Sequence, residues 1–171
     1  FNQFTERLVH SLPHIGLAYG HRIPVRNVSS IEIEEASEII QKLIKHLNLQ
    51  NAVLYIQFMV TESGPKIIEV APRLDGCHLW RLIKYATGHD IRQYAVDLLM
   101  NKQVDHVKSR KESPEFLTLK FHQLETGDIF SENNLKDPDD YLYNEYRYDE
   151  GEKVRSVNGT LEVVGYYIKR G

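Results

Sequence analysis

The stretch from Val53 to Arg73, VLYIQFMVTESGPKIIEVAPR, determines how the fold of this chain is interpreted. Its first part, Val53–Val60, is almost wholly apolar, and Lys66–Ala71 is short and rich in β-branched residues. Glu62–Pro65, between them, contains a glycine and a proline, which are typical of turns. The pattern predicts two antiparallel strands joined as a hairpin.

Two polar side chains interrupt this apolar hairpin. Because side chains alternate along a strand, Gln57 shares a face with Tyr55, and Glu69 shares a face with Ala71 on the return strand. If the two faces coincide, an amide and a carboxylate lie close together in an apolar sheet. Burying them is costly unless a ligand satisfies their oxygens, and a hard cation such as Mg²⁺ would do so.

This hairpin, closed by Ile68–Arg73, resembles the metal-binding hairpin of the ATP-grasp enzymes, which join a carboxylate to an amine through an acyl phosphate. The likeness extends to Gly20–Pro24 upstream, and to Arg73–Gly76 and Ala86–Asp90 downstream, which are similar to the amino acid and peptide ligase branch. It covers roughly Pro13–Asn101. The resemblance implies an α+β fold in which this chain is the second half of an ATP-grasp domain, an antiparallel sheet with covering helices.

The resemblance also implies the chemistry of the hairpin. Gln57 and Glu69 would bind Mg²⁺, with Mn²⁺ as an alternative, and Arg73 would be the catalytic residue that holds the transferred phosphate. Many family members have an acid where this chain has Gln57, although carbamoyl phosphate synthetases have glutamine. Much of the family has asparagine where this chain has Ala71, which implies one fewer ligand and leaves open whether one or two ions bind.

Four further residues are candidates for substrate binding. The resemblance implies that His21 reaches the acceptor pocket. Asp75, Gly76 and His78 lie at the turn into a helix, where free backbone amides favour an anion. A structural explanation exists for several candidates: His21 as a histidine of a strand, Glu69 as a surface carboxylate, and Arg73 as the partner in a surface ion pair.

Composition restricts the class of protein. The chain has 171 residues, with 21 basic and 24 acidic side chains and a net charge of −3. Its basic residues are scattered and no apolar run is long enough to span a membrane, so neither a nucleic acid nor a membrane is expected as a partner. The single cysteine, Cys77, excludes an internal disulfide and indicates a reducing compartment, the cytoplasm.

Helix and strand signals organise the rest of the chain. Ser29 and Glu32 have the spacing of a capping box at the start of a long amphipathic helix. A second helix is predicted from Cys77 to Ala86, ending at Gly88, and a third is capped by Asp90 and buries Leu98 and Leu99. Strands are predicted at 116–121, 141–148 and 161–168, and Thr5–Val9 has a helix-like composition. We expect a metal-binding half (residues 1–103), a linker (104–114) and a small β-rich C-terminal subdomain (115–171).

The chain contains no glycine-rich phosphate loop. We therefore expect it to be a piece of a longer protein, whose missing N-terminal part supplies that loop. The predicted function is a fragment of an ATP-dependent carboxylate-amine ligase that uses Mg²⁺ and ATP on small-molecule carboxylate and amine substrates and is inactive by itself. The alternative is a non-catalytic ligand-binding or interaction module derived from the same fold. The sequence leaves the substrates and the oligomeric state open.

Overall fold

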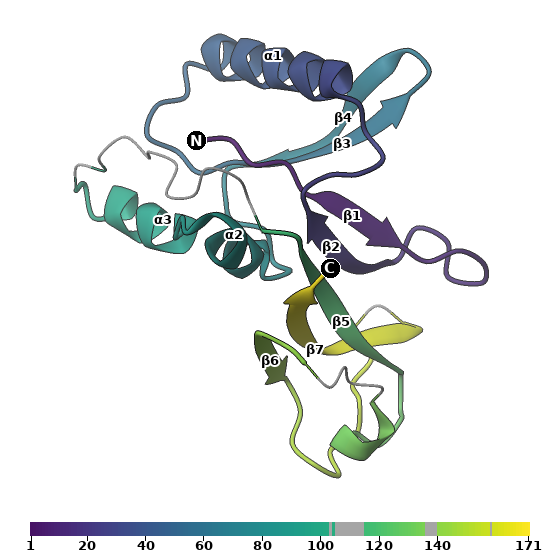
Figure 1. Ribbon diagram of the computed structural model, residues 1–171. Coiled ribbons are helices and arrows are strands. Elements are labelled where there is room, and N and C mark those ends of the chain that lie inside the picture. Colours follow the sequence, from purple (N-terminus) through teal and green to yellow (C-terminus); the bar gives the residue numbers. More distant parts are fainter. Residues whose placement is uncertain (103, 105–114, 136–139, 158) are drawn as a thin grey trace. The chain divides into compact units, whose positions relative to one another are not determined.

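The computed structural model describes residues 1–102, 104, 115–135, 140–157 and 159–171 (Figure 1). The chain divides into two compact units. The first contains Phe1–Phe4 and Val25–Pro114, and the second contains Thr5–Pro24 and Glu115–Gly171.

The first unit is built around the predicted hairpin. Strand β3 (Tyr55–Thr61) pairs antiparallel with β4 (Gly64–Ala71), which confirms the expected pairing. The turn between them closes at Gly64, whose φ of 85° lies in the left-handed region that glycine adopts without strain. The Thr61 hydroxyl donates to the Gly64 carbonyl over 2.8 Å and so fixes the turn.

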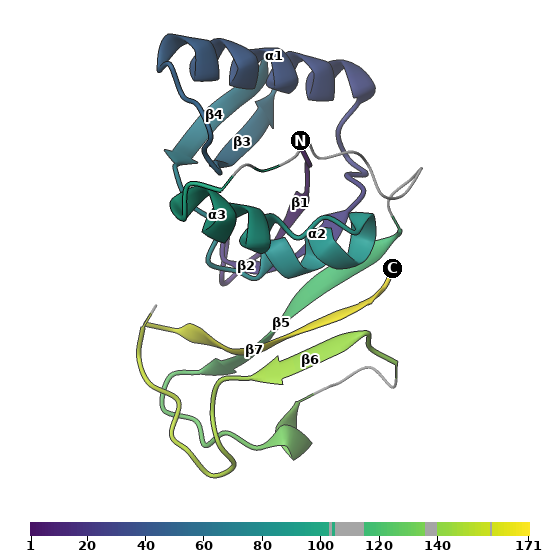
Figure 2. The same cartoon turned by 90° about the vertical axis from the view of Figure 1, so that its left-hand side faces the viewer.

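Helix α1 (Ser30–His46) lies along this hairpin and packs against β4 (Figures 1 and 2). Its predicted capping box is present. The Glu32 amide donates to the Ser29 hydroxyl over 3.3 Å, and the Glu32 carboxylate accepts from the Ser29 amide over 2.7 Å. These reciprocal bonds satisfy amides that the first turn of a helix leaves without intrahelical partners.

Helices α2 (Leu79–Thr87) and α3 (Ile91–Leu99) complete the first unit and contact each other. As predicted, α2 ends at a left-handed Gly88, and the Asp90 carboxylate caps α3 by accepting from the Gln93 amide. The expectation that Leu99 is buried is wrong: it is 85% exposed. None of the helices in the described residues is long and apolar enough to cross a membrane.

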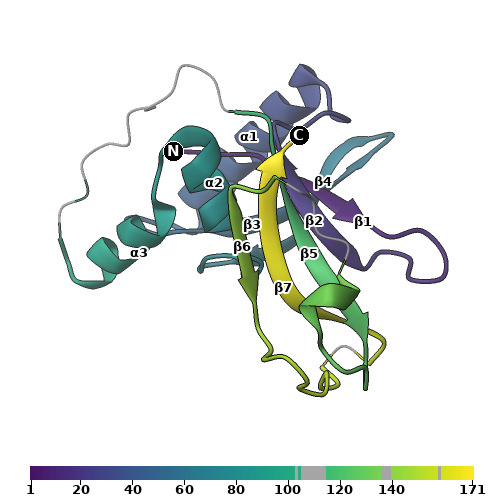
Figure 3. The same cartoon turned by 60° about the horizontal axis from the view of Figure 1, so that its bottom comes forward.

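The second unit is a five-stranded antiparallel sheet in the order β1-β2-β5-β7-β6 (Figure 3). Its strands are β1 (Glu6–Val9), β2 (Ala18–Ile23), β5 (Leu117–Glu125), β6 (Tyr143–Tyr146) and β7 (Leu161–Arg170). The three strands predicted in the C-terminal part are therefore present, with shifted ends. Ile23, Leu117, Leu119 and Ile168 of these strands are fully buried, and Phe130, Val154 and Val164 form a hydrophobic core cluster in this unit.

The helix expected at Thr5–Val9 is wrong, because residues 6–9 form β1 and pair with β2. A double hydrogen bond between the Arg22 guanidinium and the Glu6 carboxylate, at 2.6 and 2.8 Å, joins the two strands. Pairing with a distant segment has thus overridden the local preference of this short stretch.

The division by contacts also differs from the expected domains. Thr5–Pro24 was expected in the metal-binding half, but β2 pairs with β5, so these residues belong with the C-terminal strands. This pairing requires Gly20, since a Cβ at that position would lie 2.4 Å from the Leu119 carbonyl oxygen. Apart from Val104, the expected linker lies outside the described residues.

Candidate functional site

The hairpin brings two of the predicted site residues together. Gln57 and Glu69 are direct partners in the β3–β4 register, so their side chains lie on one face of the sheet, as predicted. Immediately beyond this pair the register shifts, because Phe58 aligns with Ile67 and leaves Ile68 as an extra residue. Such a β-bulge bends the strand and re-aims neighbouring side chains, and bulges are frequent beside active sites.

Arg73 and Tyr55 join this pair. The Arg73 guanidinium donates to the Glu69 carboxylate over 3.1 Å, and its central carbon lies 5.8 Å from the centre of the Tyr55 ring. The Tyr55 hydroxyl in turn donates to Gln57 Oε1 over 3.4 Å. Tyr55, Gln57, Glu69 and Arg73 therefore form one connected group, which we call the hairpin cluster.

The hairpin cluster is more exposed than expected. The Glu69 side chain is 45% exposed and the Arg73 side chain is 55% exposed, so the expectation of a buried carboxylate is wrong. The neighbours of Glu69, Ile67 and Ile68, are also exposed, at 37% and 53%, so other parts of the chain cover this part of β4 poorly. The cost of burial therefore gives no argument for a metal, and the exposed ion pair matches the structural explanation that the sequence left open.

The donor set of the hairpin cluster nevertheless suits Mg²⁺. Gln57 Oε1 and the Glu69 carboxylate are hard oxygen ligands, and Mg²⁺ is usually held by one or two carboxylates with water and substrate phosphates completing its coordination. Ala71 has no side-chain oxygen to add. In the part of the chain that the structure describes, no group of three or more histidine, cysteine, aspartate or glutamate side chains could hold a metal ion.

The residues that follow Arg73 form the turn into α2. The Asp75 carboxylate accepts from the Cys77 amide over 2.6 Å, and His78 adopts a left-handed conformation with φ 60°. This turn explains why α2 begins at Leu79 rather than at Cys77 as expected. A Cβ added to Gly76 would meet nothing within 4 Å, so there is open space beside this turn. Substrate binding by Asp75, Gly76 and His78 stays a prediction.

His21 belongs to the second unit, whereas the other predicted site residues belong to the first. It lies in β2 between Arg7 of β1 and Leu119 of β5, and it is only 3% exposed. Burial, reinforced by the charge of Arg7, lowers the pKa of His21 to about 4. The imidazole is therefore neutral at pH 7, and a role for it in substrate binding stays a prediction.

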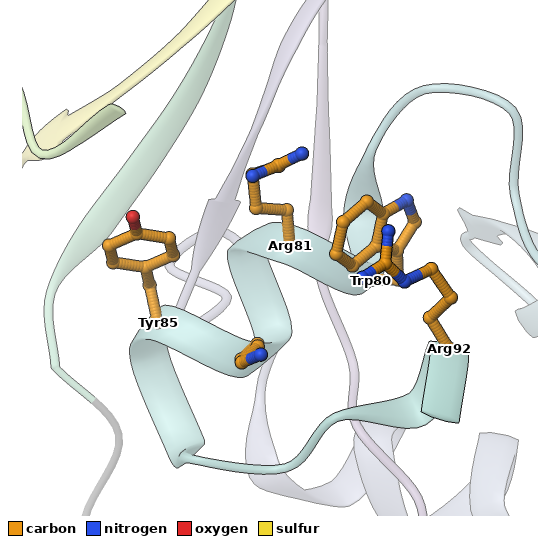
Figure 4. A pocket seen from close by; sticks show the side chains of 5 residues that line it. Trp80, Arg81, Tyr85 and Arg92 are labelled. Atoms are coloured by element: carbon orange, nitrogen blue, oxygen red, sulfur yellow. The ribbon is translucent and has the colours of Figure 1, made fainter. Parts of the chain in front are cut away.

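A second group of side chains, which the sequence did not lead us to expect, lines a pocket. Trp80, Arg81, Lys84 and Tyr85 of α2 and Arg92 of α3 line an open pocket of about 400 Å³ (Figure 4). The sequence indicates part of this pocket, because residues four positions apart are neighbours on a helix. This spacing places Trp80 beside Lys84 and Arg81 beside Tyr85.

Comparison with known proteins identifies the fold. No protein-family model matches the chain, and no curated protein sequence matches it. Among solved structures, the chain is similar to phosphoribosylglycinamide synthetase from Anaerococcus prevotii, with a TM-score of 0.74 and 16% identity over 98% of this chain. It is also similar to L-amino acid ligase from Bacillus licheniformis, with a TM-score of 0.71 and 12% identity over 92% of this chain.

A third similar structure contains bound ligands. It is the biotin carboxylase domain of the 2-oxoglutarate carboxylase from Hydrogenobacter thermophilus in complex with MgADP, ADP and bicarbonate, with a TM-score of 0.62 and 12% identity over 91% of this chain. The chain spans 43%, 40% and 35% of the lengths of these three proteins, which is less than half of each.

Proposed function

From the premise that this chain has the fold of part of an ATP-grasp protein, we propose that it is the metal-binding part of an ATP-dependent carboxylate-amine ligase. One observation carries the proposal. Gln57 and Glu69 occupy one register position of the hairpin, and the Arg73 guanidinium lies on the Glu69 carboxylate, so two oxygen ligands and a phosphate-binding cation share one face.

Each residue of the hairpin cluster has a role in this proposal. Gln57 Oε1 and the Glu69 carboxylate hold Mg²⁺, which when bound neutralises charge on the phosphates of ATP. The Tyr55 hydroxyl orients the Gln57 amide so that its oxygen faces the same side. The ion pair with Glu69 holds the Arg73 guanidinium beside the metal ligands, where its planar set of donors can bind the transferred phosphoryl group.

The proposed reaction has two steps. A substrate carboxylate oxygen attacks the γ-phosphorus of ATP, which forms an acyl phosphate and releases ADP. The amine nitrogen then attacks the acyl carbon, the bond from that carbon to the phosphate oxygen breaks, and the amine loses a proton as inorganic phosphate leaves. The chain contributes positioning and charge stabilisation to both steps and forms no covalent bond with the substrate.

The similar structures support this choice of reaction and ligands. Two of them are named as a synthetase and a ligase, and the carboxylase domain was solved with MgADP. Because the chain spans less than half of these proteins, we propose that a further segment of the same protein supplies the phosphate-binding loop. We also propose that the protein acts in the cytoplasm on a small-molecule carboxylate and amine, with His21, Asp75, Gly76 and His78 contacting substrate.

A non-catalytic module is the second candidate function. The exposed ion pair between Glu69 and Arg73 favours it, since each side chain already has a partner without metal or nucleotide. Gln57 and Ala71 also give the hairpin fewer charged or oxygen-bearing ligands than an acid and an asparagine would. A module of this kind would bind its ligand without hydrolysing ATP.

Release of ADP separates the two functions. Residues 1–171 joined to the proposed further segment should release ADP in repeated turnovers only when Mg²⁺, a carboxylate and an amine are all present, as tested with pooled amino acids. The 171-residue chain alone should release no ADP above background. Strong ATP hydrolysis by the chain alone would show that the active site has been misplaced. If the longer protein releases no ADP with any pool of amino acids, the non-catalytic module is favoured.

A further inference from the structure

The pocket on α2 and α3 is independent of the hairpin cluster and has an unusual lining. Three of its five lining residues, Arg81, Lys84 and Arg92, are cations, and the other two, Trp80 and Tyr85, are aromatic. None of the five is acidic. Its volume of about 400 Å³ is within the range of small-molecule sites.

The sequence of the two helices explains why these side chains converge. Leu79, Leu82, Ile83 and Ala86 are buried on the inner side of α2, which leaves Trp80, Arg81, Lys84 and Tyr85 on its outer side. The chain then reverses at the left-handed Gly88. This reversal brings Arg92, the second residue of α3, to the same pocket.

The Trp80 ring holds two of the cations in place. The central guanidinium carbons of Arg81 and Arg92 lie 4.5 and 4.1 Å from its centre (Figure 4). A guanidinium that stacks on a ring uses its flat face, while its N–H donors point outward in its own plane. Stacking of Arg92 on Trp80 therefore orders its donors in advance for a ligand that accepts hydrogen bonds.

The third cation is fixed by a carboxylate. Lys84 Nζ lies 2.6 Å from Asp90 Oδ2, while Asp90 Oδ1 accepts from the Gln93 amide at the start of α3. Partial burial alone would raise the pKa of Asp90, but the bonds from Lys84 and Gln93 outweigh it and lower that pKa. Asp90 is thus ionised at neutral pH and offsets one of the three positive charges around the pocket.

The lining of the pocket, three cations and two aromatic rings, suits an anion. Arg81, Lys84 and Arg92 gather positive charge around about 400 Å³, of which Asp90 offsets a part, and a bound anion relieves the remaining repulsion. A phosphate monoester carries a charge of about −1.5 to −2 at pH 7 and has three strong acceptor oxygens, which suit the planar donors of guanidinium groups. We propose that this pocket is a binding site for the phosphate monoester group of a small molecule.

The chain offers a direct probe of this site, because Trp80 is its single tryptophan. Glycerol 3-phosphate is titrated into the 171-residue chain at constant ionic strength while the tryptophan fluorescence is recorded. Succinate and sulfate are titrated in parallel as a dicarboxylate and an inorganic dianion. The fluorescence should change as glycerol 3-phosphate is added until it reaches a plateau. The ligand concentration at half of this change should be lower for glycerol 3-phosphate than for succinate or sulfate.

Variants separate specific binding from a general effect of charge. Arg92→Gln should raise the Kd for glycerol 3-phosphate by about tenfold or more, since a hydrogen bond to a charged group contributes about 1.5–3 kcal/mol. Arg155→Gln is the matched control, because Arg155 also lies over an aromatic ring, Tyr148 at 5.3 Å, but belongs to the second unit. The Kd of the Arg155→Gln variant for glycerol 3-phosphate should equal that of the wild type.

Circular dichroism of the variants shows whether each is folded, and the double variant Arg81→Gln/Arg92→Gln should no longer reach a plateau. The proposal is overturned if glycerol 3-phosphate gives no plateau with the wild-type chain, or if a folded double variant binds as tightly as the wild type. Equal affinity for succinate or sulfate would overturn the assignment to a phosphate monoester.

Discussion

Gln57 and Glu69 face each other across the β3–β4 hairpin, one residue before a bulge that inserts Ile68 into the second strand. The pairing places an amide oxygen and a carboxylate on one face, and the bulge breaks the regular alternation directly beside them. A one-residue slip of the register would separate the two side chains to opposite faces. The geometry of the proposed metal site thus depends on this register and not on burial.

Replacing Glu69 by Gln tests that site. The change removes one charge and keeps the shape, so the fold should be retained while the affinity for Mn²⁺, measured by electron paramagnetic resonance on the chain, decreases. In the longer protein, turnover should decrease by about a hundredfold, as when one group that stabilises transition-state charge is lost. Glu62→Gln, in the turn of the same hairpin, is the control. Unchanged turnover at saturating Mg²⁺ would exclude Glu69 as a catalytic metal ligand.

Replacing Arg73 by Lys tests phosphate binding separately from metal binding. A lysine keeps the charge but cannot donate in two directions from a planar group, so turnover in the longer protein should decrease nearly as much as in Glu69→Gln. The free energy of unfolding should change by no more than about 1 kcal/mol, because the ion pair with Glu69 is exposed to solvent. Urea unfolding and a turnover assay on the same preparation measure both quantities, and full activity would assign Arg73 to the surface ion pair alone.

Local signals in the sequence predicted local structure well. Three features could be predicted because each depends on residues a few positions apart. They are the capping box at Ser29 and Glu32, the end of α2 at Gly88 and the Asp90 cap. The hairpin was readable for the same reason, since its strands are joined by a short turn. The fold class followed from these elements and from the family resemblance.

Contacts between segments far apart in the chain could not be predicted from the sequence. Strand β2 pairs with β5 about a hundred residues later, and no local pattern specifies that pairing. Thr5–Val9 was therefore interpreted as helical, and the pairing of β1 and β2 with the C-terminal strands was not predicted. The exposure of Glu69 was missed similarly, because it depends on which distant segments cover this part of β4, where Ile67 and Ile68 are exposed too. The pocket at Trp80 requires the reversal at Gly88, which brings α3 back toward α2.

His21 should make the stability of the second unit depend on pH. Its pKa in the folded chain is about 4, below its ordinary value of 6.5, so the unfolded chain binds a proton more readily than the folded one. Stability is therefore full above pH 6.5 and decreases as the pH falls toward 4, by up to about 3 kcal/mol. In urea unfolding, the free energy of unfolding of His21→Gln should decrease less over this pH range than that of the wild type. That of His46→Gln, at the exposed end of α1, should decrease as much as that of the wild type. An NMR titration that places the His21 pKa near 6.5 would contradict the prediction.

Glu162 should be essential to the stability of the same unit. Its side chain is 2% exposed, and Oε1 accepts from the Thr126 hydroxyl and from the amides of Val157 and Gly159, at 3.1, 2.8 and 2.9 Å. Loss of this carboxylate leaves buried or partly buried donors without their acceptor, which costs about 1–3 kcal/mol for each group that water cannot reach.

Glu162→Ala should therefore lower the free energy of unfolding by about 2–4 kcal/mol, whereas Glu125→Ala, an exposed carboxylate at the end of β5, should change it by less than about 0.5 kcal/mol. Urea unfolding followed by circular dichroism compares the two. Because Val157 and Gly159 precede β7, hydrogen exchange at their amides should also become faster in Glu162→Ala. Equal stabilities for the two variants, with the exchange of those amides unchanged, would show that the carboxylate does not hold this segment.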